Sequence, residues 1–314
     1  MTETPFEAVG YRLEAVGKNA LQPPAYSLWS YVDIWTPFRV LLRLTGIVLW
    51  LMLVLAAMTC TIPVGWFLPR GARFVKPRQT VQRVRKKISY ALLRGGLVLL
   101  GTRVTVRGTP PAPPFFVVGN HISWIDFFVT NTLVNAVCIS EAIVSDVPLA
   151  RFLLKGMDLI IVTRTREKLI ETNELMVRAM EAGCNIVMAP EATVSPGRRV
   201  CHFHSGLFES AVRVGRPVHY ASLTVRTPYG WPPPTRSILS PDPNLPIKDP
   251  TPEETELMRH QNERGFLRYF LGLLSLPWHE YIVTFAPEPI LGTDRKQLAR
   301  DLRQAVQSIF TPVE

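Results

Sequence analysis

The sequence has 314 residues, 47% of them hydrophobic, and a formal net charge of +10 at pH 7. This length accommodates one large α/β domain, or one domain together with a membrane anchor. The positive charge is unevenly placed: thirteen basic residues and no acidic residue lie between Asp33 and Asp126, and the rest of the chain holds 22 basic and 25 acidic residues. The basic run adjoins the most apolar segment and lacks the aromatic interleaving typical of a base-stacking surface. It therefore argues against nucleic acid as a partner and predicts contact with anionic membrane lipids.

The N-terminal third divides into two parts. Residues 1–37, which include Pro5, Pro23, Pro24 and Pro37, predict a polar and partly disordered lead-in. Residues 38–100 predict membrane-anchoring helices. Thr45–Ile62 is an uncharged run of 18 residues, about 27 Å as a helix. The basic run follows it, and Ile88–Leu100, interrupted by Arg94, is a second apolar stretch.

Three arrangements of these apolar stretches fit the pattern. A spanning helix would place the following domain in the cytosol by the positive-inside rule. A helical pair embedded in one leaflet would set its arginines on phosphate headgroups. A helix buried in a protein core is the third arrangement, although an uncharged run of this length exceeds the usual core pattern.

Residues 101–314 predict a single α/β catalytic domain, because short β-rich runs alternate with helical ones. The predicted strands are Val104–Arg107, Phe115–Val118, Val137–Ile139, Leu159–Thr163, Asn185–Met188, Val218–Val225 and Tyr281–Phe285. The predicted helices are Trp124–Leu133, Pro148–Lys155, Arg166–Ala182, Ser205–Val214, Glu253–Leu274 and Asp294–Phe310. This alternation predicts a mainly parallel sheet flanked by helices on both faces. The proline-rich stretch Pro228–Pro252 is expected to be a long loop over the site.

A histidine and an aspartate five positions apart, His121 and Asp126, follow the strand Phe115–Val118. An imidazole can take a proton from an alcohol, and a carboxylate on its far nitrogen fixes the tautomer and stabilises the imidazolium. No Gly-x-Ser-x-Gly sequence or other nucleophile pattern accompanies the pair, so the hydroxyl to be activated is expected to belong to the substrate. Because the predicted strands are parallel, groups that follow their carboxyl ends are expected to meet at one edge of the sheet.

Four stretches occur in the order Asn120–Asp126, Leu159–Arg164, Met188–Gly197 and Arg216–Ala221. They resemble the four sequence blocks of the glycerophospholipid acyltransferase superfamily, of the 1-acylglycerol-3-phosphate or lysophospholipid acyltransferase type. The resemblance covers about residues 85–310. The first block is matched at Asn120, His121, Ser123 and Asp126, the second at Arg164, and the third at Pro190, Glu191, Thr193, Ser195 and Gly197.

Two positions depart from the family pattern. Ala192 replaces the glycine of the third block, where a glycine suggests a positive φ or the close approach of a ligand. The fourth block lacks the proline usual near Ala221. Gly197–Glu209 is also similar to the branch of the family that contains lyso-ornithine lipid acyltransferases.

The resemblance implies a membrane-associated O-acyltransferase of lipid biosynthesis that carries a fatty acyl group from acyl-CoA or acyl carrier protein to a lysophospholipid. The acceptor that the resemblance favours is 1-acylglycerol-3-phosphate, and lyso-ornithine lipid or another lysolipid is the alternative. His121 and Asp126 would be catalytic; Asn120, Ser123, Arg164, Glu191, Thr193 and Arg198 would bind substrate, with Arg199 as a second candidate for the phosphate. Glu191 and Thr193 would alternatively stabilise the loop, and Glu191 would alternatively pair with Arg198 or Arg199.

No cofactor beyond the acyl donor and no metal is expected. Cys60, Cys138, Cys184 and Cys201 lack Cys-x-x-Cys spacing and are interpreted as reduced packing residues. His202 and His204 would share one face of a strand, but no second ligand pair follows them. The rival from another class is a catalytically inactive membrane-associated homologue, which Ala192 permits and the intact His121 and Asp126 oppose.

Overall fold

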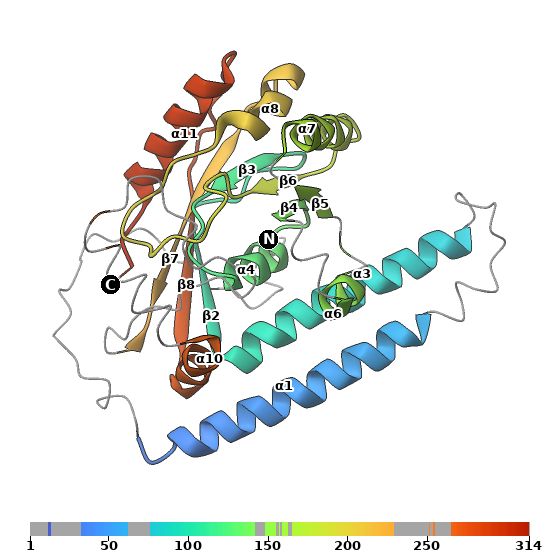
Figure 1. The fold of residues 1–314 in the computed structure, drawn as a ribbon, viewed down its shortest axis with the longest axis vertical. Coiled ribbons are helices and arrows are strands. Elements are labelled where there is room, and N and C mark those ends of the chain that lie inside the picture. Colours follow the sequence, from blue (N-terminus) through green and yellow to red (C-terminus); the bar gives the residue numbers. More distant parts are fainter. Residues whose placement is uncertain are drawn as a thin grey trace, which may run out of the picture.

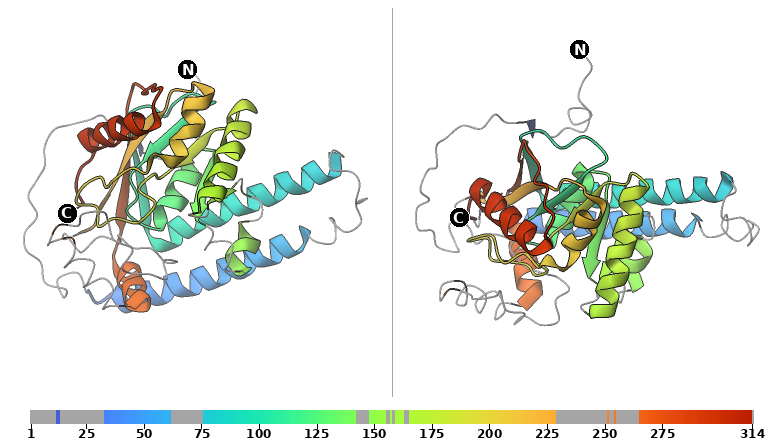
Figure 2. Two further views of the ribbon diagram at one scale, coloured as in Figure 1. Left: turned by 45° about the horizontal axis from the view of Figure 1, so that its top comes forward. Right: turned by 90° about the horizontal axis from the view of Figure 1, so that it is seen from above.

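The computed structural model describes residues 12–13, 33–61, 76–141, 148–154, 157, 159–162, 165–228, 251, 254 and 265–313. It contains a central sheet with helices on both faces and two long helices that run side by side along one end (Figures 1 and 2). The strands are β1 (Arg12–Leu13), β2 (Thr102–Arg107), β3 (Phe116–Gly119), β4 (Val137–Glu141), β5 (Leu159–Val162), β6 (Ile186–Met188), β7 (His219–Arg226) and β8 (His279–Phe285). The helices are α1 (Thr36–Thr59), α3 (Lys76–Leu100), α4 (Ile125–Leu133), α6 (Pro148–Leu153), α7 (Arg166–Glu181), the 3₁₀ helix η2 (Ser205–Phe208), α8 (Glu209–Val214), α10 (Gly265–Ser275) and α11 (Arg295–Ile309).

The strand order is β1-β2-β8-β7-β3-β6-β4-β5, and β7–β8 is the one antiparallel pair between these strands. The prediction of a mainly parallel sheet flanked by helices is confirmed, and each of the seven predicted strands is present. The short strand β1, which pairs in parallel with β2, was not predicted. The stretch predicted as one helix over Ser205–Val214 divides into η2 and α8. Of the helix predicted over Glu253–Leu274, the structure describes Glu254, which is helical, and the part from Gly265 onward.

Two apolar clusters fill the two sides of the sheet. Val117 of β3 belongs to the cluster that packs against α3, α4 and α10, whereas its neighbours Phe116 and Val118 belong to the cluster under α7, α8 and α11. This alternation follows from the two-residue period of a strand. All four residues of β3 are buried, as expected for a central strand covered on both faces. The core therefore fixes the position of the residues that follow β3.

Helix α1 has 24 residues, about 36 Å, and begins nine residues earlier than the predicted apolar run. It is the one helix in the described part of the chain long and apolar enough to cross a membrane, and only 6% of its apolar window is buried. Leu41, Leu49 and Met52 are each more than half exposed, so the alternative of a buried core helix is wrong. The second apolar stretch is not a separate element, because Ile88–Leu100 forms the C-terminal half of α3.

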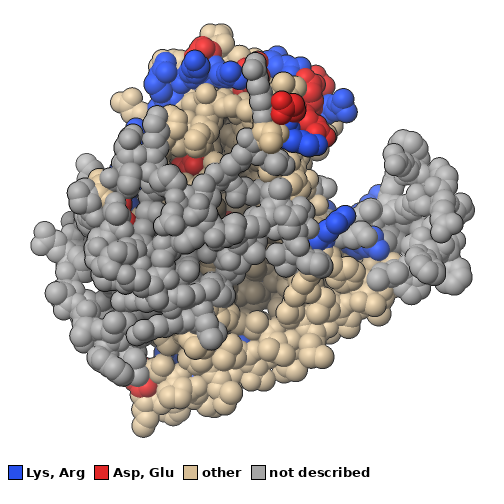
Figure 3. All heavy atoms as spheres, viewed as in Figure 1, with Lys and Arg blue, Asp and Glu red and all other residues tan. Residues whose placement is uncertain are grey.

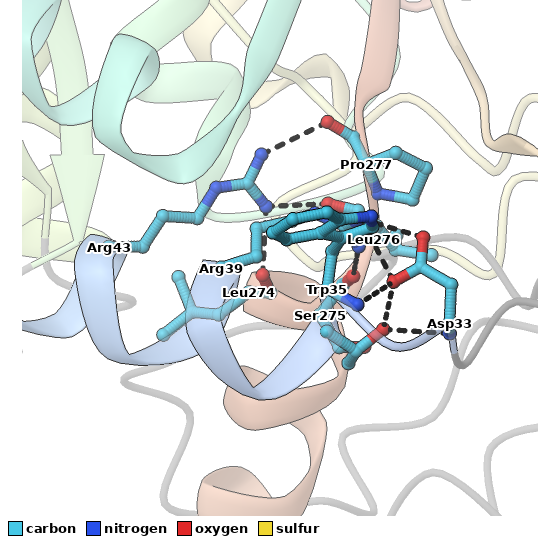
Figure 4. A network of polar contacts seen from close by, with 9 residues as sticks. Asp33, Trp35, Arg39, Arg43, Leu274, Ser275, Leu276 and Pro277 are labelled. Carbon is cyan, nitrogen blue, oxygen red and sulfur yellow. Dashed lines mark hydrogen bonds and ion pairs between the residues drawn. The ribbon is translucent and has the colours of Figure 1, made fainter.

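Helix α1 packs antiparallel to α3, since Gly46 approaches Leu99 and Thr61 accepts a hydrogen bond from Arg85. Its first turns are attached to α10 (Figure 4). Arg39 donates to the carbonyl of Ser275 and pairs with Asp33, and Arg43 donates to the carbonyls of Leu274, Leu276 and Pro277 at 2.6–3.1 Å. These two arginines bind carbonyls at the C-terminal end of α10, where cations are favoured. The contact of the arginines with phosphate headgroups stays a prediction.

Candidate active site

The imidazole of His121 and the carboxylate of Asp126 are in direct contact. His121 follows β3, and Asp126 lies in the first turn of α4. His121 Nδ1 is 2.8 Å from Asp126 Oδ2, and the same oxygen accepts the backbone N–H groups of Ile122 at 2.7 Å and Ser123 at 3.0 Å. The side chain of Asp126 is 7% exposed and that of His121 is 28% exposed. The carboxylate is thus fixed inside the protein, and the ring it holds is accessible from outside.

This contact determines which ring nitrogen takes part in chemistry. A carboxylate at Nδ1 favours the tautomer that carries its proton on Nδ1, so Nε2 is the nitrogen that accepts a proton. The negative charge of Asp126 also stabilises the imidazolium that forms, and the N-terminus of α4 and the two N–H groups keep that charge in place. The pair has the arrangement of a general base with its orienting group.

Glu191 connects the base to the loop that follows β6. Its Oε2 accepts the backbone N–H of His121 at 2.8 Å and its Oε1 accepts that of Cys201 at 2.7 Å. The backbone N–H of Ser195 in turn donates to the carbonyl of His121 at 2.8 Å. Because β3 and β6 are parallel neighbours, the segments that follow them meet at one edge of the sheet, as the sequence predicted. Burial raises the pKa of Glu191 to about 7, against the two N–H groups that lower it.

Asn120, Ser123 and Glu191 were expected to bind substrate, and their contacts give them another role. The amide of Asn120 donates to the carbonyl of Leu223 and accepts the N–H of Leu223, both at 2.8 Å. Ser123 Oγ accepts the N–H of Ile125 at 3.2 Å at the start of α4. All three side chains are buried. They hold the backbone on either side of His121, and the bonds of Glu191 favour the alternative that it stabilises the loop. Contact of these three residues with substrate stays a prediction.

The arginines and Thr193 are distributed differently from the expectation. Arg198 is exposed and donates to the carbonyl of Val313 at 2.8 Å, and Thr193 is partly exposed on the same loop. Arg199 binds both carboxylate oxygens of the buried Glu254, at 3.0 and 3.1 Å. Arg164 lies outside the described residues, and its contact with a phosphate stays a prediction.

Ala192 adopts the backbone conformation of the glycine it replaces. Its φ is +56°, and it is the one non-glycine residue with a positive φ in the part of the chain that the structure describes. The left-handed region disfavours residues with a Cβ by roughly 1–2 kcal/mol. The side chain of Ala192 is exposed. A glycine at this position would adopt the same φ without that cost, and this chain holds the conformation with a strained alanine.

Histidine and cysteine residues elsewhere do not extend the site. The rings of His202 and His204 are exposed and 5.4 Å apart, and the described residues contain no group of three or more His, Cys, Asp or Glu arranged to hold a metal. The four cysteines are free thiols, but Cys60 is exposed rather than packed. His279 is fully buried, and burial lowers its pKa to about 3, so it is neutral beside the hydroxyl of Thr102.

Comparison with known proteins shows what these features resemble. Residues 103–223, which include His121, Asp126 and Glu191, match the sequence profile of the acyltransferase family. The chain is similar to a lyso-ornithine lipid O-acyltransferase of Pseudomonas aeruginosa, with 26% identity over 236 residues, which are 74% of this chain and 81% of that protein. It is also 26% identical to a 1-acyl-sn-glycerol-3-phosphate acyltransferase of Neisseria gonorrhoeae over 142 residues, 44% of this chain and 56% of that protein.

Among solved structures, the fold resembles that of the 1-acyl-sn-glycerophosphate acyltransferase PlsC from Thermotoga maritima. The TM-score is 0.50 with 16% sequence identity, and the match covers 87% of this chain and 97% of that one. This likeness concerns the fold, while the sequence matches concern the residues of the site. Residues 103–223 match the acyltransferase family, so this part of the chain is an acyltransferase domain.

Proposed function

We propose that this protein transfers a fatty acyl group from a thioester donor, acyl-CoA or acyl carrier protein, to the hydroxyl of a lysolipid at a membrane surface. The observation that carries the proposal is the 2.8 Å contact between His121 Nδ1 and Asp126 Oδ2 with the ring 28% exposed. The family match supports acyl transfer as the reaction class.

In the proposed reaction, His121 Nε2 takes the proton of the lysolipid hydroxyl while that oxygen attacks the thioester carbonyl. The imidazolium is stabilised by Asp126 as the tetrahedral intermediate forms. The intermediate then expels the thiolate, the C–S bond breaks, and the proton on Nε2 passes to the sulfur. A general base supplies about 10²–10⁴ in rate, so the positioning of the two substrates supplies much of the remainder.

Two acceptors are supported by different observations. The third sequence block and the Neisseria relative favour 1-acylglycerol-3-phosphate, whose phosphate would meet Arg164 or Arg198. The longer alignment, over 74% of this chain, favours lyso-ornithine lipid. Arg199 is a weaker candidate for a phosphate ligand, because Glu254 already binds its guanidinium.

The proposed membrane contact is through α1 and α3. The surface of α1 is nearly free of charge, and the charged residues gather at the opposite end of the molecule (Figure 3). Helix α1 is held along its length, by α10 at Arg39 and Arg43, by the carbonyl of Leu92 at Trp50, and by Arg85 at Thr61. A helix bound to its own protein in this way is better placed within one leaflet than across the bilayer. The basic residues of α3 and the preceding segment favour the anionic cytoplasmic leaflet.

The experiment uses the full chain in vesicles containing phosphatidylglycerol. Each lysolipid is supplied with acyl-CoA or with acyl carrier protein, and diacyl products are measured by mass spectrometry. We expect one donor–acceptor pair to give product and the His121→Ala variant to give none while still floating with the vesicles. His219→Ala is the matched control, because His219 begins β7 at the opposite end of the strands. Absence of product from every pair, with the protein bound to vesicles, would favour the inactive homologue.

A further inference from the structure

An apolar groove runs between α1 and α3. Its volume is about 400 Å³, within the range of roughly 300–1,000 Å³ found for ligand clefts. It is lined by Gly46, Leu49, Trp50, Leu53, Gly95, Val98 and Leu99. We call it the helix groove.

Two glycines allow the helices to approach and form the groove. A Cβ on Gly95 would lie 2.3 Å from the indole of Trp50, and one on Gly46 would lie 2.8 Å from Leu99 Cδ2. The missing side chains leave Trp50 and Leu99 as its floor. The helix groove is therefore a product of close helix packing and not a gap left by poor packing.

The helix groove opens onto the apolar surface assigned to the membrane. Leu49 is 62% exposed, Leu53 is 59% exposed and Val98 is 75% exposed. Exposed aliphatic side chains around an apolar hollow favour a hydrocarbon occupant over water.

Cations lie on the same exposed stripe of α3. Val98, Arg94 and Lys87 are all exposed and follow helical spacing, with Arg94 one turn, about 6 Å, from Val98. Neither α1 nor α3 contains an acidic residue, so all the charged side chains of the two helices are positive. An apolar groove with cations near one end matches a lipid that has an acyl chain and an anionic headgroup.

The helix groove is separate from the His121–Asp126 site. Gly95 faces Trp50 of α1, whereas its neighbour Gly96 faces Phe128 of α4, where a Cβ would lie 3.0 Å from the Phe128 ring. Asp126 is on α4. The helix groove and the catalytic pair thus lie on different sides of α3, and the occupant of the groove is not the reacting lipid.

We propose that the helix groove binds one acyl chain of an anionic membrane phospholipid, with the phosphate of that lipid at Arg94 and Lys87. This inference rests on the proposed membrane association and does not depend on the acyl transfer reaction. The bound lipid would fill the hollow between the two helices and complete the surface that they present to the leaflet.

To test this, the full chain is bound to vesicles that contain equal amounts of phosphatidylglycerol and phosphatidylcholine and is then released into mild detergent. The lipids that stay bound to the protein are counted by native mass spectrometry. Wild type is expected to keep one phosphatidylglycerol. Val98→Trp, which fills the helix groove from an exposed position, should reduce retention at least about tenfold. Val48→Trp places the same side chain on the exposed face of α1 outside the groove and should retain the lipid. Arg94→Gln should lower the preference for phosphatidylglycerol about fivefold.

Equal retention by Val98→Trp and Val48→Trp would overturn the groove as the site, and an unchanged preference in Arg94→Gln and Lys87→Gln would overturn the headgroup assignment. Flotation and acyl transfer are measured on the same variants. If the wild type did not float with vesicles, membrane association would be refuted. If the wild type retained the lipid but gave no acyl transfer that depends on His121, only the proposed function would be refuted.

Discussion

The carboxylate of Glu191 accepts the backbone N–H of His121 at 2.8 Å and so holds the proposed base through its main chain. Because Glu191 also binds Cys201, one buried side chain determines the distance between the segment after β3 and the loop after β6. The position of the imidazole therefore depends on a residue that was expected to meet the substrate.

The protonation of Glu191 should make stability depend on pH. In the folded protein, burial of the carboxyl group is the largest influence on the pKa of Glu191 and raises it from 4.5 to about 7. Between these values the folded state binds more protons than the unfolded state, so the contribution of Glu191 to the free energy of unfolding falls as pH rises. The difference in unfolding free energy between wild type and Glu191→Gln, measured in detergent, should decrease from pH 5 to pH 7 and level off above. A difference that rises over this range would contradict the assignment.

His121 and Asp126 should behave as one catalytic unit. Asp126→Asn and His121→Ala should each lower kcat by about 10²–10⁴, and the double variant should lose little more than the worse single variant, because each removal already disables the pair. Asp301→Asn on α11 is the control for loss of a carboxylate and should keep full activity. Independent, multiplicative losses in a kinetic double-mutant cycle would show that the two residues act separately.

Asn120 should matter for stability more than for substrate affinity. Asn120→Ala leaves the buried N–H and carbonyl of Leu223 without these partners, which should cost about 2–4 kcal/mol. Asn135→Ala removes the amide of an exposed asparagine that accepts a bond from Tyr90, and should cost about 0.5 kcal/mol or less. Chemical denaturation of both variants compares them. A raised KM with unchanged stability in Asn120→Ala would restore the substrate-binding interpretation.

The sequence sufficed for the elements and for the contact between His121 and Asp126, because both depend on short-range patterns. Short β-rich runs marked the seven strands, and His121 and Asp126 are only five positions apart in the sequence. The sequence did not reveal the antiparallel pairing of β7 with β8, because β7 and β8 are joined by a long connection that imposes no direction on the second strand. It also could not assign the partners of Asn120, Glu191 and Arg43, because those contacts are with backbone atoms of distant residues, which carry no sequence signal.

Ala192 provides a test of whether its conformation is strained. Ala192→Gly should relieve the left-handed conformation and leave the free energy of unfolding unchanged or higher by up to about 1 kcal/mol, since the added chain entropy of glycine offsets part of the gain. Ala182→Gly is the matched control, because Ala182 has a φ of −74° at the end of α7 and should lose about 0.5–1 kcal/mol. Equal losses in the two variants would contradict strain at Ala192.

Arg43 should anchor α1 to the catalytic domain independently of any lipid. Its guanidinium binds the carbonyls of Leu274, Leu276 and Pro277 at the end of α10 (Figure 4). Arg43→Ala removes three charge-assisted hydrogen bonds in a partly buried position and should lower the free energy of unfolding by about 2–4 kcal/mol. Hydrogen exchange should then increase in α10 and in the first turns of α1, while flotation persists because the apolar stripe is intact. Arg83→Ala, at an exposed arginine of α3, should change stability by no more than about 0.5 kcal/mol. Equal exchange in α10 for the two variants would show that Arg43 does not hold the helix.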